Sequence, residues 1–361
     1  MNGRSPLYDL HRQSGATFTH VGDGQVPDSF GDPATEYQAL REGVALLDRS
    51  LTGRFRVTGR DALDLLNRLS TNKVDVLPPG TGAGTILTTN KGRVIDLLHL
   101  FSRPDHLLMV TSPQTRSRVA EWIDLYTFLE EVTLQDVTEA TCTATLLGPQ
   151  AMAVVETLTG VRVGAWQPYT SASVVVDGVE AALLRSDPLG RPAYDLVVPA
   201  EQGEALWTAL ASAGATPVGE RAYNGARVEA GIPRHGWELS EEVNPWEVNL
   251  QGYIHFEKGC YVGQEVILRL DTYKKVQRRL VALAFGQGPV PERAVLQREG
   301  QEVGVVTSAA EHPVTGAWIG LGLVRVASAS SGTELQVVGE GSETMGTARV
   351  TELAPSATVP A

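Results

Sequence analysis

The stretch from residue 36 to residue 125 alternates helical and strand patterns, and this alternation constrains the fold more than any other feature. Apolar residues recur at the helical interval in some segments, and short apolar runs with strand character lie between them. The expected elements are helices over 36–47, 62–69 and 116–125, and strands over 54–58, 84–89, 94–101 and 107–111. Asp61 is placed to cap the second helix, and Asn90 and Gly92 are typical of a hairpin turn. This order predicts a mixed α+β layer.

The rest of the chain contains two further units. After residue 144 the expected elements are helices over 151–158 and 203–213, and strands over 173–176, 181–185 and 194–198. The two α+β units are therefore candidate copies of one motif. From residue 279 onward, short strands with glycine turns predict a barrel. Residues 1–34 are polar and rich in glycine, which is typical of a frayed arm or of a strap across the first domain.

Composition limits the class of protein. A chain of 361 residues with a net charge of −12 is long enough for two or three domains. The acidic balance argues against a general nucleic-acid binder, because phosphate binding needs a basic surface. No apolar run reaches the roughly 18 residues that span a bilayer, and the first residues lack the apolar core of a secretory signal. The two cysteines, Cys142 and Cys260, are far apart in the sequence, which favours a reducing, cytoplasmic setting.

Several common site motifs are missing. No dinucleotide-binding glycine motif, P-loop or Gly-x-Ser-x-Gly sequence occurs, and the histidines lack zinc spacing, so we expect no metal site. His235 and His255 either line a pocket or pack as ordinary residues. The densest basic run is either a solvated linker or a rim that receives an anionic ligand or partner; it comprises Lys274, Lys275, Arg278 and Arg279.

The octapeptide KGCYVGQE at residues 258–265 is the strongest candidate for chemistry. A thiol is a nucleophile or ligand only as thiolate, which a nearby cation favours. If the segment is extended, Lys258 and Cys260 point to the same side, so the ammonium can sit beside the sulfur. Cys260 is then a nucleophile, a redox group or a metal ligand; otherwise it is a small buried apolar group. It cannot hold an iron–sulfur cluster alone, because such clusters take four thiolates and the chain has two cysteines.

This octapeptide resembles the signature of the YgfZ family, the folate-binding relatives of the glycine-cleavage T-protein (aminomethyltransferase). Three further segments resemble that superfamily: LREGVALLD at 40–48, RVEAG at 227–231, and VGVVTS at 303–308 with IGLG at 319–322. The resemblance covers most of the chain. It implies an α+β fold with two ferredoxin-like units around a central cavity, followed by a C-terminal β-barrel. The implied domains are 1–143 (folate-binding, sharing the 220–276 segment), 144–276 (with the cysteine motif) and 277–361 (the barrel).

The resemblance also implies a folate site. A pterin ring presents adjacent N–H donors on one edge, and a carboxylate such as Glu229 matches two of them. The alternative for Glu229 is a salt bridge with Arg227, which belongs to the same folate-site segment. Tyr223 is expected either to stack on the pterin or to pack as an ordinary core residue.

Other positions have more open roles. Tyr261 and Gln264 either fix the cysteine loop and contact ligand, or Gln264 and Glu265 merely begin a strand over 266–270. T-proteins read Gly-x-x-x-Asp-Asp-Leu where this chain has GRVIDL at 92–97, so Asp96 remains and Ile95 replaces the other acid. Asp96 is then either a residue that contacts the folate or an ordinary turn or edge residue. The T-protein Tyr-Thr-Gly-Glu segment is also absent, with DPLGRPAY at 187–194 as its nearest equivalent. These departures count against aminomethyl transfer.

The function implied is that of a tetrahydrofolate-binding protein that supports the assembly or repair of iron–sulfur enzymes, including those that modify tRNA. The ligand is tetrahydrofolate or a one-carbon derivative, Cys260 and Lys258 are the catalytic candidates, and iron–sulfur enzymes are the possible protein partners. Direct contact with nucleic acid or membrane is not expected. Two alternatives remain: an aminomethyltransferase of the glycine-cleavage type, and an interaction scaffold with a vestigial folate site.

Overall fold

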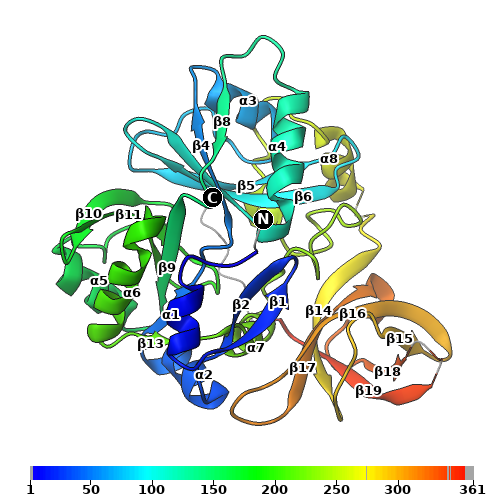
Figure 1. Cartoon of the computed structure of the whole chain (residues 1–361). Coiled ribbons are helices and arrows are strands. Elements are labelled where there is room, and N and C mark those ends of the chain that lie inside the picture. Colours follow the sequence, from blue (N-terminus) through cyan, green and yellow to red (C-terminus); the bar gives the residue numbers. More distant parts are fainter. Residues whose placement is uncertain (1–2, 274, 340, 342, 354–361) are drawn as a thin grey trace.

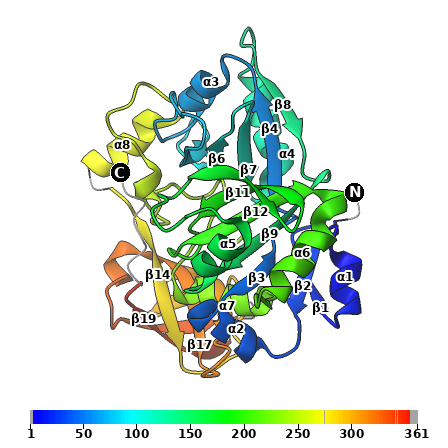
Figure 2. The same cartoon turned by 90° about the vertical axis from the view of Figure 1, so that its left-hand side faces the viewer.

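The structure is a computed structural model that describes residues 3–273, 275–339, 341 and 343–353. Two α+β units and a barrel are visible in it, with the barrel in orange and red (Figure 1). A view turned by 90° shows the strands of the second unit in front of the first (Figure 2). Lys274, one residue of the expected basic run, lies outside the described residues.

The first unit is an antiparallel sheet in the order β5-β6-β7-β4-β8, within the described part of the chain. Its strands are β4 (Gly53–Thr58), β5 (Gly82–Thr88), β6 (Val94–Ser102), β7 (Leu107–Thr111) and β8 (Thr133–Asp136). Helices α3 (Ala62–Leu69) and α4 (Arg116–Leu125) contribute apolar side chains to the core on one face of the sheet. A short turn, η1 (Pro113–Thr115), precedes α4. The helices and strands expected here are confirmed, apart from small shifts at their ends.

The second unit repeats this arrangement in the order β10-β11-β12-β9-β3-β13. Its strands are β9 (Thr141–Leu147), β10 (Ser171–Val176), β11 (Val179–Ser186), β12 (Ala193–Pro199) and β13 (Thr216–Pro217), joined by β3 (Ala45–Asp48). Its helices are α5 (Ala151–Thr159) and α6 (Gly203–Ser212), the latter preceded by η2 (Ala200–Gln202). Apart from the inserted β3, each strand and helix corresponds to one in the first unit, in the same chain order. The two units therefore share one motif, as expected.

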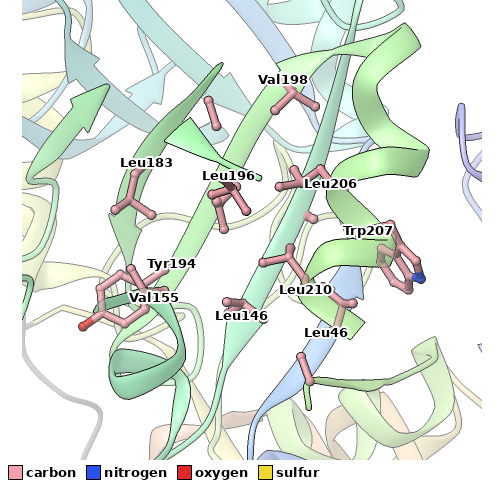
Figure 3. Close-up of a cluster of buried hydrophobic side chains, with 14 of the residues drawn as sticks. Leu46, Leu146, Val155, Leu183, Tyr194, Leu196, Val198, Leu206, Trp207 and Leu210 are labelled. Atoms are coloured by element: carbon pink, nitrogen blue, oxygen red, sulfur yellow. The ribbon is translucent and has the colours of Figure 1, made fainter. Parts of the chain in front are cut away.

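The second sheet has two chemically different faces, because side chains alternate along each strand. Leu146, Leu196 and Val198 point toward α5 and α6 and form an apolar core with residues of those helices (Figure 3). Burying a leucine or valine fully is worth about 2 kcal/mol. The residues between them, such as Thr145 and Asp195, face the other way, into the middle of the molecule. Packing on one face thus fixes the polar groups on the other.

The N-terminal segment differs from the expectation. The helix expected over 36–47 is α2 (Pro33–Glu42), which ends at Gly43, and the run from Ala45 to Asp48 becomes β3 because it pairs with β9. Residues 1–34 contain α1 (Tyr8–Gln13) and the hairpin of β1 (Thr17–Val21) and β2 (Gly24–Ser29). His11 of α1 is fully buried against Trp207 of α6. This segment therefore packs as a strap mainly on the second unit, while Gly22 at the turn of the hairpin lies against Gln114 of the first unit.

The C-terminal third is a closed barrel in the order β14-β17-β16-β15-β18-β19, within the described residues. Its strands are β14 (Arg278–Phe285), β15 (Val295–Arg298), β16 (Gln301–Glu311), β17 (Trp318–Arg325), β18 (Glu334–Val338) and β19 (Thr344–Thr351), with η4 (Val326–Ser328). Inward-facing valine and leucine side chains fill it. The expected barrel is confirmed, and with it the α+β class.

The segment between the second unit and the barrel connects all three parts. It contains α7 (Glu220–Glu229), η3 (Gln251–Tyr253) and α8 (Gln264–Thr272), so the strand expected over 266–270 is a helix instead. α7 contacts α2 on one side and β16 and β17 on the other. Side chains between residues 239 and 267 pack on β5 and β6 of the first unit. The proposed boundary at 143/144 lies within β9, and the division into domains stays a prediction.

No helix in the described ranges combines the length and apolar character that a membrane crossing requires.

A buried ion pair between Arg227 and Glu238 gives a prediction for stability. Their side chains are 1% and 0% exposed, and Arg227 Nη1 donates to Glu238 Oε2 at 2.8 Å. We expect Glu238→Gln to lower the free energy of unfolding by about 3–5 kcal/mol, because it leaves the guanidinium buried without its counter-charge. Urea denaturation measures this. The control, Glu334→Gln, breaks an exposed pair with Arg349 and should cost less than about 1 kcal/mol. Equal small losses would contradict the assignment.

Candidate functional site

A cavity of about 530 Å³ lies between the two sheets, a size that suits a ligand of a few tens of atoms. Leu97 and His99 of β6 line it from the first unit, and Thr145 and Asp195 line it from the second. The β1–β2 hairpin, the first turns of α7 and residues 231–235 and 249–253 close its sides. The expected central cavity is therefore present.

Most charged side chains around the cavity already have partners within the protein. The ion pairs are Arg227–Glu238, Arg234–Glu220, Arg185–Asp187 and His11–Asp48. Arg54 is 1% exposed and donates to the backbone carbonyls of Ser50, Thr52, Thr138 and Thr141. These groups stabilise the cavity wall and have little capacity left for a ligand.

Asp195 is the carboxylate most available to a ligand. It lies near the middle of β12, lines the cavity, and forms no ion pair with any described residue. Thr145 Oγ1, directly opposite on β9, donates to Asp195 Oδ1 at 2.5 Å. Burial raises the pKa of Asp195, against the opposing effects of hydrogen bonds from Thr145 and Ser186 and of the charge of Arg49. A half-buried carboxylate with spare acceptor capacity suits a ligand that presents N–H donors.

Arg49 is the corresponding cation. It follows β3, lines the cavity, and its guanidinium lies 4.8 Å from the centre of the Tyr223 ring. Among the described residues no hydrogen bond or ion pair from the guanidinium is present, although that group carries five N–H donors. Burial alone would lower the pKa of Arg49, but nearby Tyr223, Glu220 and Asp195 raise it above its ordinary value.

Of the residues expected to bind folate, the structure places Tyr223 and Arg227 in the cavity wall. Tyr223 offers a ring face, which Arg49 already covers in part. Arg227 is occupied on all its nitrogens: Nε donates to Asn224, Nη1 to Glu238 and Nη2 to Ser308. We assign Arg227 to holding the wall, and its contact with a ligand stays a prediction.

Glu229, the expected pterin anchor, does not line the cavity. It lies at the end of α7, accepts from Arg41 Nη1 at 3.1 Å and from the Tyr37 hydroxyl, and its side chain is 38% exposed. Residues two apart on a helix lie on different faces, so Arg227 points inward while Glu229 points toward α2. The same geometry rules out the alternative salt bridge between Arg227 and Glu229. The partner of Arg227 is Glu238 instead.

Asp96 is also absent from the cavity wall. It is fully buried in β6 and accepts from the backbone N–H of Ser112 at 2.8 Å, from Ser112 Oγ at 2.7 Å and from Thr115 Oγ1 at 2.5 Å. These donors lie at the start of η1 and α4, so Asp96 stabilises the beginning of a helix. Burial raises the pKa of Asp96. A ligand contact for Asp96 stays a prediction, and its cavity-side neighbours are Leu97 and Ser112.

Lys258 does not use its ammonium on the thiol, contrary to the expectation. Its Nζ donates to the backbone carbonyls of Asn67 at 2.7 Å, Ser70 at 2.8 Å and Asn72 at 2.5 Å. Burial lowers the pKa of Lys258 to about 8, with a small opposing effect of Asp75. An ammonium has three donors, and all three are occupied. Lys258 therefore attaches the cysteine motif to the loop after α3.

Several other residues of the motif are anchored as well, whereas Cys260 is exposed. Tyr261 is buried against β5 and β6, and its hydroxyl has no partner in the described part of the chain. Gly263 has φ +84°, and a Cβ there would lie 2.5 Å from the carbonyl oxygen of Thr89, so only glycine fits. Gln264 begins α8. Cys260 is an exposed free thiol, outside the cavity wall, whereas Cys142 is buried.

The remaining candidates are divided between the cavity and the surface. His235 lines the cavity, whereas His255 does not. Within the basic run, Arg278 pairs with Glu247 at 2.9 Å, and Lys275 lies beside the Tyr273 ring. None of the three described residues of this run lines the cavity, so their role as a rim for an anionic ligand stays a prediction.

Sequence reasoning missed Asp195 and Arg49, two charged cavity residues that form no ion pair with any described residue. A signal for Asp195 exists: it is a lone acid in the apolar run 193–198, directly after the DPLGRPAY segment. Strand alternation places it opposite the core-facing Tyr194 and Leu196. Arg49 follows the recognised 40–48 segment by one residue, but only the register of β3 shows that it points into the cavity.

Comparison with known proteins agrees with this architecture. Residues 7–258 match the GCVT N-terminal domain family, and residues 278–355 match the glycine cleavage T-protein C-terminal barrel domain family. The chain therefore belongs to the glycine cleavage T-protein superfamily. The crystal structure of the glycine cleavage system aminomethyltransferase T from Bartonella henselae has the same fold, with a TM-score of 0.88, 23% identity and 99% of each chain covered.

Curated relatives carry similar names. The aminomethyltransferase of Geobacillus kaustophilus is 33% identical over 343 residues, which are 92% of this chain and 93% of the relative. The aminomethyltransferase of Desulforamulus reducens is 30% identical over 341 residues, 93% of each chain. A putative chloroplastic transferase of Arabidopsis thaliana is 30% identical over 320 residues, 88% of this chain and 73% of the relative.

The anchoring role of Lys258 is testable. We expect Lys258→Met to lower the free energy of unfolding by roughly 3 kcal/mol, because three carbonyls lose their donor. Urea denaturation measures this, and Lys91→Met, at an exposed turn, is the control. The rate at which iodoacetamide alkylates Cys260 in the folded variant should stay unchanged. Full stability combined with slower alkylation would instead support a role of Lys258 in activating the thiol.

Proposed function

We propose that this protein binds tetrahydrofolate in the cavity and catalyses one-carbon transfer of the aminomethyltransferase type. The observation that carries the proposal is the cavity between the two sheets, with the half-buried carboxylate of Asp195 available on its wall. The family membership and the names of the relatives support the same activity. Tetrahydrofolate is then a substrate, whose N5 (in the pteridine ring) and N10 (beside it) accept or release the one-carbon unit.

The donor and acceptor groups fit this ligand. The pterin ring has an amino group and a ring N–H side by side, and one carboxylate accepts from both. Asp195 takes over the role that the sequence assigned to Glu229. The ring of Tyr223 supplies an aromatic face on the same cavity wall. Exclusion of water by the surrounding strands strengthens these hydrogen bonds.

A transfer assay tests the activity directly. The protein is mixed with an aminomethylated lipoyl carrier protein and tetrahydrofolate, and formation of methylenetetrahydrofolate is followed. We expect turnover that Asp195→Asn strongly reduces and that the surface control Asp177→Asn leaves intact. Folate binding without any turnover would contradict the transferase activity but not the binding site.

A second candidate function follows from Cys260. Its thiol is exposed on a loop whose neighbours Lys258, Tyr261 and Gly263 are all fixed to the first unit, so the loop presents the sulfur to a partner. This favours the YgfZ-like role in supporting iron–sulfur enzymes, including those that modify tRNA. Such enzymes would be the protein partners. The two free thiols are compatible with a cytoplasmic location.

Genetic rescue separates the two functions. Cells lacking an endogenous YgfZ-like protein receive the wild type or Cys260→Ala, and the activity of their iron–sulfur enzymes is measured. The second candidate requires rescue by the wild type and its loss in the variant, with unchanged affinity for tetrahydrofolate. Full rescue by Cys260→Ala would remove the thiol from the mechanism.

The charge of Asp195 predicts how binding depends on pH. Ionised Asp195 accepts the pterin donors, so affinity should fall as the pH drops through its pKa. Because burial raises that pKa, the loss should begin at a higher pH than for an ordinary aspartate. Calorimetry with tetrahydrofolate should show about 10–100-fold weaker binding for Asp195→Asn. In that variant the pH dependence should largely disappear; a wild type with flat affinity over the same range would contradict this assignment.

A further inference from the structure

Arg49 and Asp195 lie on the same face of the second sheet, two strands apart. Asp195 of β12 is opposite Thr145 of β9, and Thr145 is in turn opposite Leu47 of β3. Arg49 follows Leu47 by two residues and therefore shares its side of the strand. Its backbone N–H still pairs with β9, at the carbonyl of Thr143. The Cα atoms of Arg49 and Asp195 are thus offset by roughly 10 Å across the sheet and roughly 7 Å along it.

These two residues are opposite charges that do not pair. The charge of Arg49 acts on Asp195, whose pKa it lowers, yet no ion pair between them is present in the described residues. The other arginines and acids of the cavity wall are held by protein partners, whereas the guanidinium of Arg49 has none beyond the Tyr223 ring in the part of the chain that the structure describes. Arg49 is half-buried, and a guanidinium partly withdrawn from water without hydrogen bonds is unfavourable, so the position favours a ligand atom that accepts them.

A pterin ring supplies both kinds of group on one edge. Its 2-amino group and N3–H are donors, and the neighbouring 4-oxo group is an acceptor. The carboxylate of Asp195 can only accept, and the guanidinium of Arg49 can only donate. The negative charge of Asp195 therefore matches the donor side of the ring edge, and the positive charge of Arg49 matches the 4-oxo acceptor next to it.

We infer that Arg49 donates to the 4-oxo group of the pterin while Asp195 accepts from its amino side, and that Arg49 thereby determines which pteridines bind. This inference rests on the proposed folate site. It assigns a specificity for 4-oxo over 4-amino pteridines, because a 4-amino group would turn a donor toward the guanidinium. A site discriminates most strongly between two similar ligands when the wrong ligand leaves a buried polar group of the protein without a hydrogen-bond partner.

The experiment compares two reduced ligands that differ at position 4 and in the N3 proton, tetrahydrofolate and tetrahydroaminopterin. Anaerobic calorimetry gives both dissociation constants for the wild type and for Arg49→Met. We expect the wild type to bind tetrahydrofolate at least about tenfold more tightly, and Arg49→Met to remove most of this preference by weakening tetrahydrofolate alone. Arg12→Met, at an exposed position on α1, is the control and should keep the wild-type ratio.

The possible outcomes separate this inference from the proposed function. A wild type that binds both ligands equally, or an Arg49→Met variant that keeps the full preference, overturns the role of Arg49 and leaves the folate site standing. A wild type that binds neither ligand overturns both. Because the N3 proton that tetrahydroaminopterin lacks faces Asp195, the wild-type preference alone does not assign it to Arg49; if Arg49→Met does not fold, Arg49→Ala takes its place in the same comparison.

Discussion

The buried ion pair between Arg227 and Glu238 is the interaction that joins α7, the cavity wall and the barrel. Arg227 belongs to α7, Glu238 to the loop that follows it, and Ser308, from β16 of the barrel, donates to Glu238 Oε1 at 2.5 Å. Glu238 also accepts from the backbone N–H of Arg234 at 3.0 Å. One carboxylate thus fixes the helix, the barrel and the cavity wall at residues 231–235. Because both charges are buried, removal of either group leaves the other charge in apolar surroundings without its partner.

In the second sheet, the side chains that stabilise the fold and those that line the proposed site lie on opposite faces, because side chains alternate along each strand. One face carries the leucines and valines that pack on α5 and α6, and the other carries Arg49, Thr145 and Asp195. Placing two unpaired charges inside a protein works against folding. Such an arrangement is typical of a binding site, where the ligand supplies the missing partners. In the cysteine motif, by contrast, the Lys258 ammonium is fully hydrogen-bonded and Tyr261 is buried, while the Cys260 thiol is exposed.

Much of the fold could be predicted from local patterns, because most helices and strands have regular spacing of apolar residues. The exceptions have physical causes. Residues 45–48 continue a helical pattern but pair with β9, and residues 264–272 form a helix where a strand was expected. The site was harder, because it depends on long-range register. Glu229 has the right chemistry but points away from the cavity on its helix, whereas Asp195 faces it from a strand. The direction in which the Lys258 side chain points is set by backbone carbonyls that lie 186–191 residues earlier in the chain.

The central claim is that the pterin ring lies on the polar face of the second sheet. A crystal structure of the protein with tetrahydrofolate tests this most directly. The account predicts the ring inside the cavity, with its amino edge on the carboxylate of Asp195 and the exposed sulfur of Cys260 away from it. Ring density at Glu229 or beside Cys260, with the cavity filled only by water, would contradict the account.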